Sequence, residues 1–186
     1  MTLTRWRPTP RSNCAILVRD WRTVRILGID PGIGTTGWGL IEPGTDRCLL
    51  HAAGIIQTTP NSPVPGRLEV LHRELLALLD RYQPHELAIE ELFFAKNVST
   101  GIQVSHARGV ILLAAAHRSI PVFEYTPPQV KQAIVGYGNA KKAQVADMLA
   151  HHVTGAQVPR QNDAADAIAV AVTHQNARHS VVATGA

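Results

Sequence analysis

Four acidic side chains stand where a carboxylate is costly. Asp30 and Glu90 each close a short apolar segment, and Asp163 and Asp166 open a segment that otherwise holds almost only Ala, Ile and Val. A carboxylate on an apolar element loses hydration unless it is paired or bound to a metal. A single strand-end acid is commonly a turn former, and Asp163 alone is typical of a helix N-cap. Four such acids together favour a shared site.

The chemistry that these acids would support is metal-assisted hydrolysis. Asp163 and Asp166 are spaced to share one helical face near a helix N-terminus, where the dipole favours negative charge. Carboxylate oxygens without His or Cys favour Mg²⁺, with Mn²⁺ as a substitute. A pair of such ions roughly 4 Å apart offsets four negative charges and stabilises both the attacking and the leaving oxygen of a phosphodiester. We therefore predict that Asp30, Glu90, Asp163 and Asp166 bind two ions, with Asp30 bridging them.

A glycine-rich segment, residues 28–39, overlaps the first of these acids. It lacks the Lys of a P-loop and does not open a helix as a dinucleotide-binding turn does. An acid followed by Gly and Thr also resembles the phosphate turn of actin-like ATPases, but that duplicated fold needs a second such turn, which the sequence lacks. We expect a tight hairpin whose glycines let a phosphate backbone approach closely.

The elements that would position these residues predict an α/β fold with a five-stranded mixed sheet flanked by helices. The predicted strands are Val24–Asp30, Thr36–Ile41, Leu49–Gln57, Leu87–Glu90 and Pro121–Tyr125. The predicted helices are Arg67–Tyr82, Ser99–Arg118, one that opens near Pro127, one from about Asn139 to His151, and one from about Asn162 to Asn176. Asn139 and Asn162 are the predicted N-caps of the last two.

Length and charge divide the chain unevenly. Its 186 residues fit one domain of ordinary size, predicted over residues 23–178 with a short tail at 179–186. The net charge of +4 lies wholly in residues 1–22, and the rest carries equal numbers of acidic and basic residues. We interpret 1–22 as a disordered basic extension from an upstream start codon; a phosphate-contacting arm and a transit peptide remain alternatives. A neutral body can still bind DNA when its acids cluster around metal.

Other residue types narrow the class of protein. Cys14 and Cys48 form neither a disulfide framework nor a paired metal motif, and no His has a metal-type spacing. The apolar runs are too short to span a bilayer. We therefore expect a cytoplasmic protein that does not engage a membrane.

Several segments, in this order and spacing, carry a family resemblance. They are Gly28–Gly32 (GIDPG), Ala88–Asn97 (AIEELFFAKN), Ala107–Gly109 (ARG), Val130–Gln132 (VKQ) and Asp163–Ala169 (DAADAIA). The chain from about Val24 to His174 resembles the RuvC Holliday junction resolvases almost end to end. The resemblance implies an RNase H-like fold, a homodimer, and Mg²⁺-dependent nicking of two strands of like polarity at four-way DNA junctions. It also implies a role in recombination and repair beside a branch-migration complex.

The resemblance also implies roles for single residues. Asp30, Glu90, Asp163 and Asp166 match the catalytic metal-binding acids. Phe93 matches a position near the scissile strand, where it would stack on a base, and core packing is the alternative. Lys131 and Lys142 match basic positions near the phosphate, with a solvated helix face as the alternative, and Lys141 competes with Lys142 for the inward place. The apolar helix Ser99–Arg118 is the expected dimer face or ordinary core.

Two other functions stay open at this point. A non-cutting junction-binding module would use the same phosphate contacts, but it would gain nothing from four repelling acids beside DNA. An RNase H-like nuclease that acts on RNA or hybrid duplexes would use the same acids on another substrate.

Overall fold

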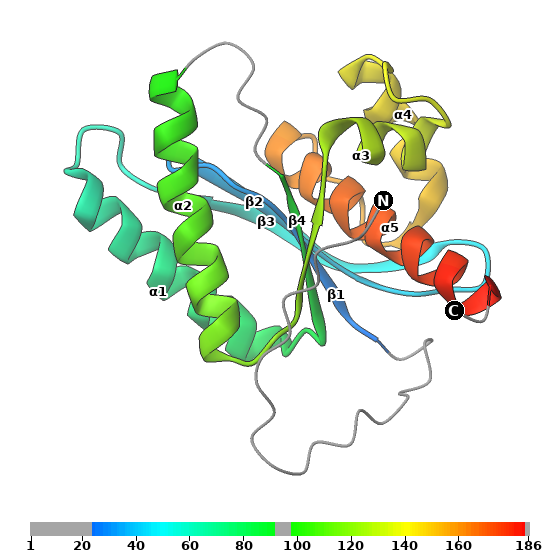
Figure 1. Cartoon of the computed structure of the whole chain (residues 1–186), viewed down its shortest axis with the longest axis horizontal. Coiled ribbons are helices and arrows are strands. Elements are labelled where there is room, and N and C mark those ends of the chain that lie inside the picture. The colour runs from blue at the N-terminus through cyan, green and yellow to red at the C-terminus, as the bar shows by residue number, and fades with distance from the viewer. Residues whose placement is uncertain (1–23, 92–97, 185–186) are drawn as a thin grey trace.

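The structure, a computed structural model, describes residues 24–91 and 98–184 (Figure 1). A six-stranded mixed sheet has the order β5-β4-β1-β2-β3-β6, with helices on both faces. The strands are β1 Ile26–Asp30, β2 Thr35–Glu42, β3 Cys48–Gln57, β4 Glu86–Glu90, β5 Val122–Tyr125 and β6 Val153–Gly155. The helices are α1 Val64–Tyr82, α2 Val98–His117, α3 Pro127–Val135, α4 Lys142–His152 and α5 Asn162–Thr184.

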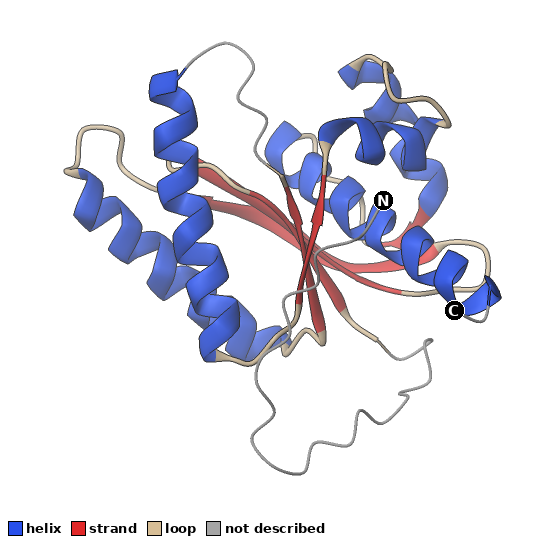
Figure 2. Cartoon of the chain, viewed as in Figure 1, coloured by secondary structure: helices blue, strands red, loops and turns tan. Residues whose placement is uncertain are grey.

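The two faces of the sheet bury different helices. Figure 2 shows α1 and α2 on one side of the sheet and α3, α4 and α5 on the other. Leu27 and Ile29 of β1 are fully buried in the cluster formed with α1 and α2, whereas Ile26 belongs to the cluster formed with α5. Because side chains alternate along a strand, Asp30 lies on the same face as Ile26, toward α5. The same alternation along β4 places Glu90 on that face too.

The predicted strands are all present, and the sheet gains β6, which pairs in parallel with β3. A three-residue strand is too short to show alternation, so the sequence pattern did not reveal it. The predicted N-cap Asn139 is wrong: Lys141 caps α4, and its backbone N–H donates to Gln144 Oε1 at 2.9 Å. The other predicted N-cap, Asn162, is wrong by one residue: it is the first residue of α5, and the carbonyl of Gln161 accepts from Ala165 N–H at 3.1 Å. Helix α5 runs on through most of the predicted tail. Residues 1–22 lie outside the described ranges.

Among the described helices, none is both long enough and apolar enough to cross a bilayer.

A buried polar network ties the second half of α5 to the sheet. The Tyr125 hydroxyl on β5 lies 2.6 Å from His174 Nδ1, and His174 Nε2 lies 2.7 Å from Glu86 Oε2 on β4. Arg178 Nε is 3.0 Å from the same Glu86 oxygen. Burial lowers the pKa of His174, so the imidazole is neutral near pH 7. One tautomer then suits both contacts: Nε2–H donates to Glu86, and Nδ1 accepts from Tyr125.

Replacing His174 with Leu should destabilise the fold. The substitution removes the hydrogen-bond partner of the buried Tyr125 hydroxyl and one of the partners of the Glu86 carboxylate, which costs roughly 2–4 kcal/mol of unfolding free energy. Urea unfolding measures the loss. His151→Leu, at an exposed position near the end of α4, should change the unfolding free energy by less than about 0.5 kcal/mol. Equal stability of the two variants would contradict a structural role for this network.

Candidate active site

Two of the predicted site acids end neighbouring strands. The parallel register pairs Ile29 of β1 with Ile89 of β4, so Asp30 and Glu90 come next to each other. Adjacent strands lie about 4.8 Å apart, and both side chains project toward α5. The ends of β1 and β4 therefore present two carboxylates side by side in the middle of the sheet.

Helix α5 brings the other two acids to the same place because glycines let it lie directly on the strands. Gly37 of β2 pairs with Asp30, and a Cβ on Gly37 would lie 1.9 Å from the backbone oxygen of Asp163. A Cβ on Gly28 would lie 2.1 Å from the backbone oxygen of Ala167. No other residue type fits at these positions without moving the helix. The room that we expected these two glycines to leave for a phosphate backbone is taken by α5.

The turn after Asp30 is held by a buried threonine. The Thr36 hydroxyl donates to the Gly32 carbonyl at 2.6 Å and lies 3.4 Å from the Gly32 backbone nitrogen. Thr36 is 1% exposed, so this contact is shielded from water. It closes the loop between β1 and β2 and limits the positions that Asp30 can adopt.

The four carboxylates form one electrostatic cluster. Burial and, after it, the charges of Glu90, Asp166 and Asp163 together raise the pKa of Asp30 to about 8, while Lys142 opposes the rise. Burial and Asp166 also raise the pKa of Glu90. The neighbouring acids thus make the ionisation of Asp30 and Glu90 more costly, which is the situation that a bound cation relieves.

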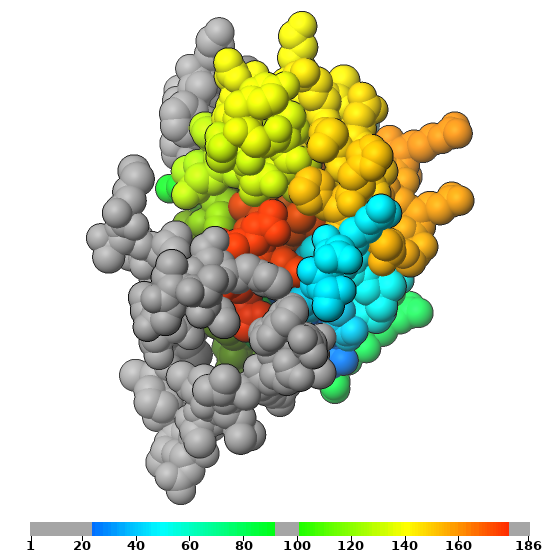
Figure 3. All heavy atoms as spheres, turned by 90° about the vertical axis from the view of Figure 1, so that its right-hand side faces the viewer, coloured from blue at the N-terminus to red at the C-terminus, as the bar shows by residue number. Residues whose placement is uncertain are grey.

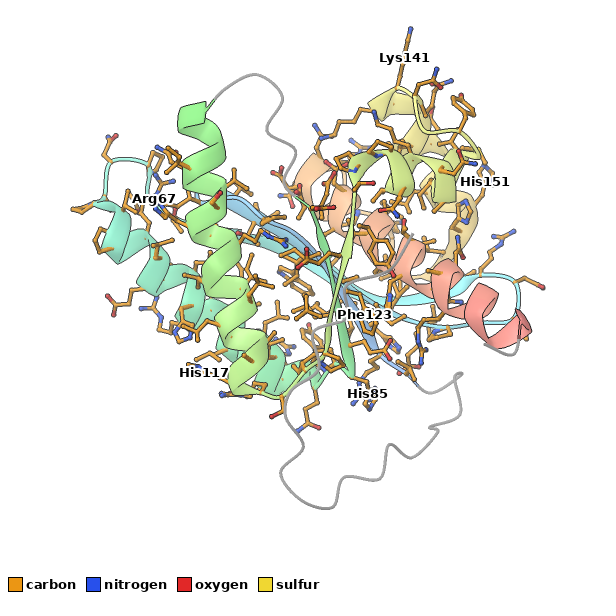
Figure 4. All side chains as sticks on the ribbon, viewed as in Figure 1. Arg67, His85, His117, Phe123, Lys141 and His151 are labelled. Atoms are coloured by element: carbon orange, nitrogen blue, oxygen red, sulfur yellow. The ribbon has the colours of Figure 1, made fainter. Side chains whose placement is uncertain are left out.

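Two lysines reach this cluster from the helices above it. Lys142 Nζ is 2.5 Å from Asp166 Oδ2, and this contact raises the pKa of Lys142. Lys131, half-buried on α3, is close enough to lower the pKa of Glu90. Lys141 points away from the fold at the tip of α4 (Figure 4). Of the two adjacent lysines, Lys142 therefore faces the acids.

An open pocket adjoins the acids between α4 and α5. Its volume is about 320 Å³, and Lys142 and Asp166 stand in its wall beside the apolar side chains of Val145 and Leu149. Figure 3 shows the side of the molecule on which α3 and α4, in yellow, lie above α5. Of the four acids, Asp166 is the one that lines this pocket.

Arg108 is a site-supporting residue to which the sequence analysis gave no role. Its guanidinium on α2 is 2.6 Å from Glu124 Oε2 on β5, and its Nη1 donates to the Glu90 carbonyl at 3.3 Å. It thereby links α2 to the end of β4, where Glu90 sits. Its place in the segment Ala107–Gly109, which carries part of the family resemblance, was the available signal.

Not every predicted site residue is placed. Phe93 lies outside the described residues. Among the residues that the structure does describe, no three Asp, Glu, His or Cys side chains already stand close enough to share one ion. The donor chemistry nonetheless fits a hard cation, because the cluster offers carboxylate oxygens whose mutual repulsion Lys142 and Lys131 offset in part.

Solved structures define the class of protein. The match to Thermus thermophilus RuvC in complex with a Holliday junction substrate has a TM-score of 0.78 at 36% identity and covers 84% of this chain and 96% of that one. A yeast mitochondrial Holliday junction resolvase has a TM-score of 0.65 at 13% identity, which shows the fold alone. The fold is RNase H-like, and the class is a nuclease of that fold.

Sequence comparisons then identify the family. A family model described as crossover junction endodeoxyribonuclease RuvC matches residues 26–174. The relative from Chloroflexus aggregans is 48% identical over 151 residues, covering 81% of this chain and 92% of that protein. The relative from Brevibacillus brevis is 45% identical over 155 residues, covering 83% and 93%. The chain belongs to the RuvC family of crossover junction endodeoxyribonucleases, which are metal-dependent and act as dimers.

The stability of the metal-free protein should depend on pH through Asp30. Its folded pKa of about 8 exceeds its ordinary value of 3.8, so between those values the folded state holds a proton that the unfolded state releases. Unfolding free energy should fall as pH rises through this window, by up to about 1.4 kcal/mol per pH unit. Asp30→Asn should flatten the decline in urea unfolding without divalent ions. Asp147→Asn, an exposed acid on α4, should leave the decline intact, and a matching decline in Asp30→Asn would refute the assignment.

Arg108→Leu should impair turnover more than folding. Losing the guanidinium frees the end of β4 and leaves Glu124, which is partly exposed, to water. We expect the single-turnover cleavage rate to fall about tenfold, equivalent to about 1.4 kcal/mol, with DNA affinity unchanged. Arg118→Leu, at the far end of α2 in an exposed pair with Asp80, is the matched control. A rate equal to that of the control would exclude a positioning role for Arg108.

Proposed function

We propose that this protein resolves four-way (Holliday) DNA junctions by nicking two strands of like polarity in a Mg²⁺-dependent reaction. The observation that carries the proposal is the convergence of Asp30, Glu90, Asp163 and Asp166 in one electrostatic cluster. Membership of a family of crossover junction endodeoxyribonucleases supports the reaction. The Thermus thermophilus relative, solved with a Holliday junction substrate, supports the DNA structure.

The four acids are proposed to be the catalytic residues. Their oxygens would hold two Mg²⁺ ions, or Mn²⁺ in substitution, and such ions supply an activated water and stabilise the leaving oxygen. Asp30 stands between Glu90 on β4 and the acids of α5, which suits it to bridging two ions. Glu90, Asp163 and Asp166 would complete the ligand set.

Lys142 and Lys131 are proposed to act on the phosphate rather than on the acids alone. Both lie within electrostatic reach of the cluster. With the carboxylates neutralised by bound cations, Lys142 would be free to turn from Asp166 toward the charge that builds on the phosphate during cleavage. Phe93, three residues after Glu90 in the sequence, is proposed as a further DNA contact.

The dimer face is proposed to lie on α2. Ile102 and Leu113 are 50% and 51% exposed, the two highest values among the exposed large apolar side chains of residues 24–91 and 98–184. Eleven residues separate them, close to three full helical turns, so they lie on one side of the helix. A two-fold dimer would place two sites on a two-fold junction, one for each nicked strand.

The cellular setting follows from the proposed substrate. Four-way junctions are DNA intermediates that join two duplexes, and they form during recombination and DNA repair. We therefore place the enzyme in the cytoplasm with the chromosome, with a branch-migration complex as its partner.

A cleavage assay with Asp30→Asn tests the assignment. Losing the bridging carboxylate should reduce junction cleavage at least about a thousandfold, equivalent to about 4 kcal/mol of barrier. Junction binding should persist, because it depends on phosphate contacts and shape. Asp147→Asn, which removes an exposed acid outside the cluster, should cut at the wild-type rate.

The choice of substrate separates the rival functions. The wild-type protein should cut a four-way junction in Mg²⁺ in preference to a linear duplex or an RNA–DNA hybrid. Binding without cutting in either Mg²⁺ or Mn²⁺ would establish a binding module instead. Preferred cutting of the hybrid would establish a ribonuclease H activity.

A further inference from the structure

Arg67 is anchored beside the turn that follows Asp30. Its Nε donates to the Thr58 hydroxyl at 2.9 Å, and that hydroxyl donates to the Ile33 carbonyl at 2.5 Å. The Thr58 backbone N–H donates to the Gly34 carbonyl at 3.0 Å. Thr58 is 8% exposed, so these hydrogen bonds are largely shielded from water. These hydrogen bonds hold the first turn of α1 against the loop between β1 and β2.

The guanidinium is held by neutral groups and retains unused donors. Only Nε takes part in the contact with Thr58, and a Cβ built on Gly34 would lie 3.5 Å from the Arg67 Nη2. Within residues 24–91 and 98–184, no carboxylate forms an ion pair with Arg67, whereas Arg73, on the same helix, pairs with Glu74 at 3.2 Å. A half-buried arginine fork without an anion is suited to binding a phosphate through two parallel hydrogen bonds.

Arg67 lies beside the loop that joins β1 to β2 and begins directly after Asp30. Gly34 lies four residues beyond Asp30, which separates them by at most about 14 Å. Nucleotides of a DNA strand rise about 3.4 Å each, so this span covers about four of them. Figure 4 shows Arg67 on the α1 side of the sheet, far from Lys141 at the tip of α4. Arg67 thus flanks the acids from the side opposite to Lys131 and Lys142.

We propose that Arg67 binds a backbone phosphate of the junction strand, within a few nucleotides of the cut. The proposal rests on the proposed function, since it takes the strand to pass over the ends of β1 and β4. Together with Lys131 and Lys142, Arg67 provides cations on both sides of the acidic cluster. The strand would then be held on either side of the phosphate that is cleaved.

The salt dependence of junction binding tests this contact. Each phosphate contact contributes about 0.9 to the slope of log affinity against log salt concentration. With divalent ions absent to prevent cutting, Arg67→Gln should reduce the magnitude of that slope by about 0.9 and weaken binding about five- to tenfold at moderate salt. Arg67→Lys keeps the charge and should retain the slope. Arg73→Gln, exposed and already paired on the same helix, should match wild type.

The outcomes are distinguishable. If Arg67→Gln keeps the wild-type slope and affinity, the phosphate contact is refuted even though the wild type binds and cuts junctions. If Arg67→Gln and Arg67→Lys both lose thermal stability while their slopes stay at the wild-type value, Arg67 only braces the turn, and the proposal fails. If the wild type neither binds nor cuts a four-way junction, the proposed function fails first.

Discussion

The contact of helix α5 with the glycines of β1 and β2 is the constraint on which the site depends. A helix normally stands off from a sheet by the thickness of the side chains between them, whereas here Gly28 and Gly37 allow backbone to meet backbone. That contact brings the first turn of α5 down to the level where β1 and β4 end. With a larger side chain at Gly37, Asp163 would be lifted away from Asp30, and the acids would no longer share one space.

The fold opposes the repulsion that this closeness creates. Burial and three neighbouring acids raise the pKa of Asp30, so bringing these groups together costs free energy in the absence of a cation. The opposing contacts lie elsewhere: fully buried Ala167, Ile168 and Val170 pack α5 on the sheet, and the polar network around His174 anchors its second half. The repulsion among the acids is thus opposed by packing and hydrogen bonds along most of the length of α5.

The distribution of charge explains how a nearly neutral body can belong to a nuclease family. The acids converge at one point, and Lys131 on α3 and Lys142 on α4 lie within electrostatic reach of them. Arg67 on α1 lies beside the loop that follows Asp30. A net charge averages over this arrangement and conceals it. At the range of a few ångströms, a strand of DNA would meet separate acidic and cationic surfaces rather than a neutral one.

The sequence by itself determined the elements and the identities of the candidate acids. Residue type indicates burial directly in the apolar segments that end in Asp30 and Glu90 and in the run of small apolar residues that opens with Asp163. The strands, the helices and the set of candidate acids could therefore be predicted. Short or capping details escaped: β6 has too few residues to show a pattern, and Lys141 rather than Asn139 caps α4. Only the tertiary structure decided which groups meet across long stretches of chain. Three features depend on contacts between distant segments: Lys142 and not Lys141 faces Asp166, Arg108 supports the end of β4, and the glycines make room for a helix. Residue type constrains local conformation, whereas sheet order and helix packing set the distances between such segments.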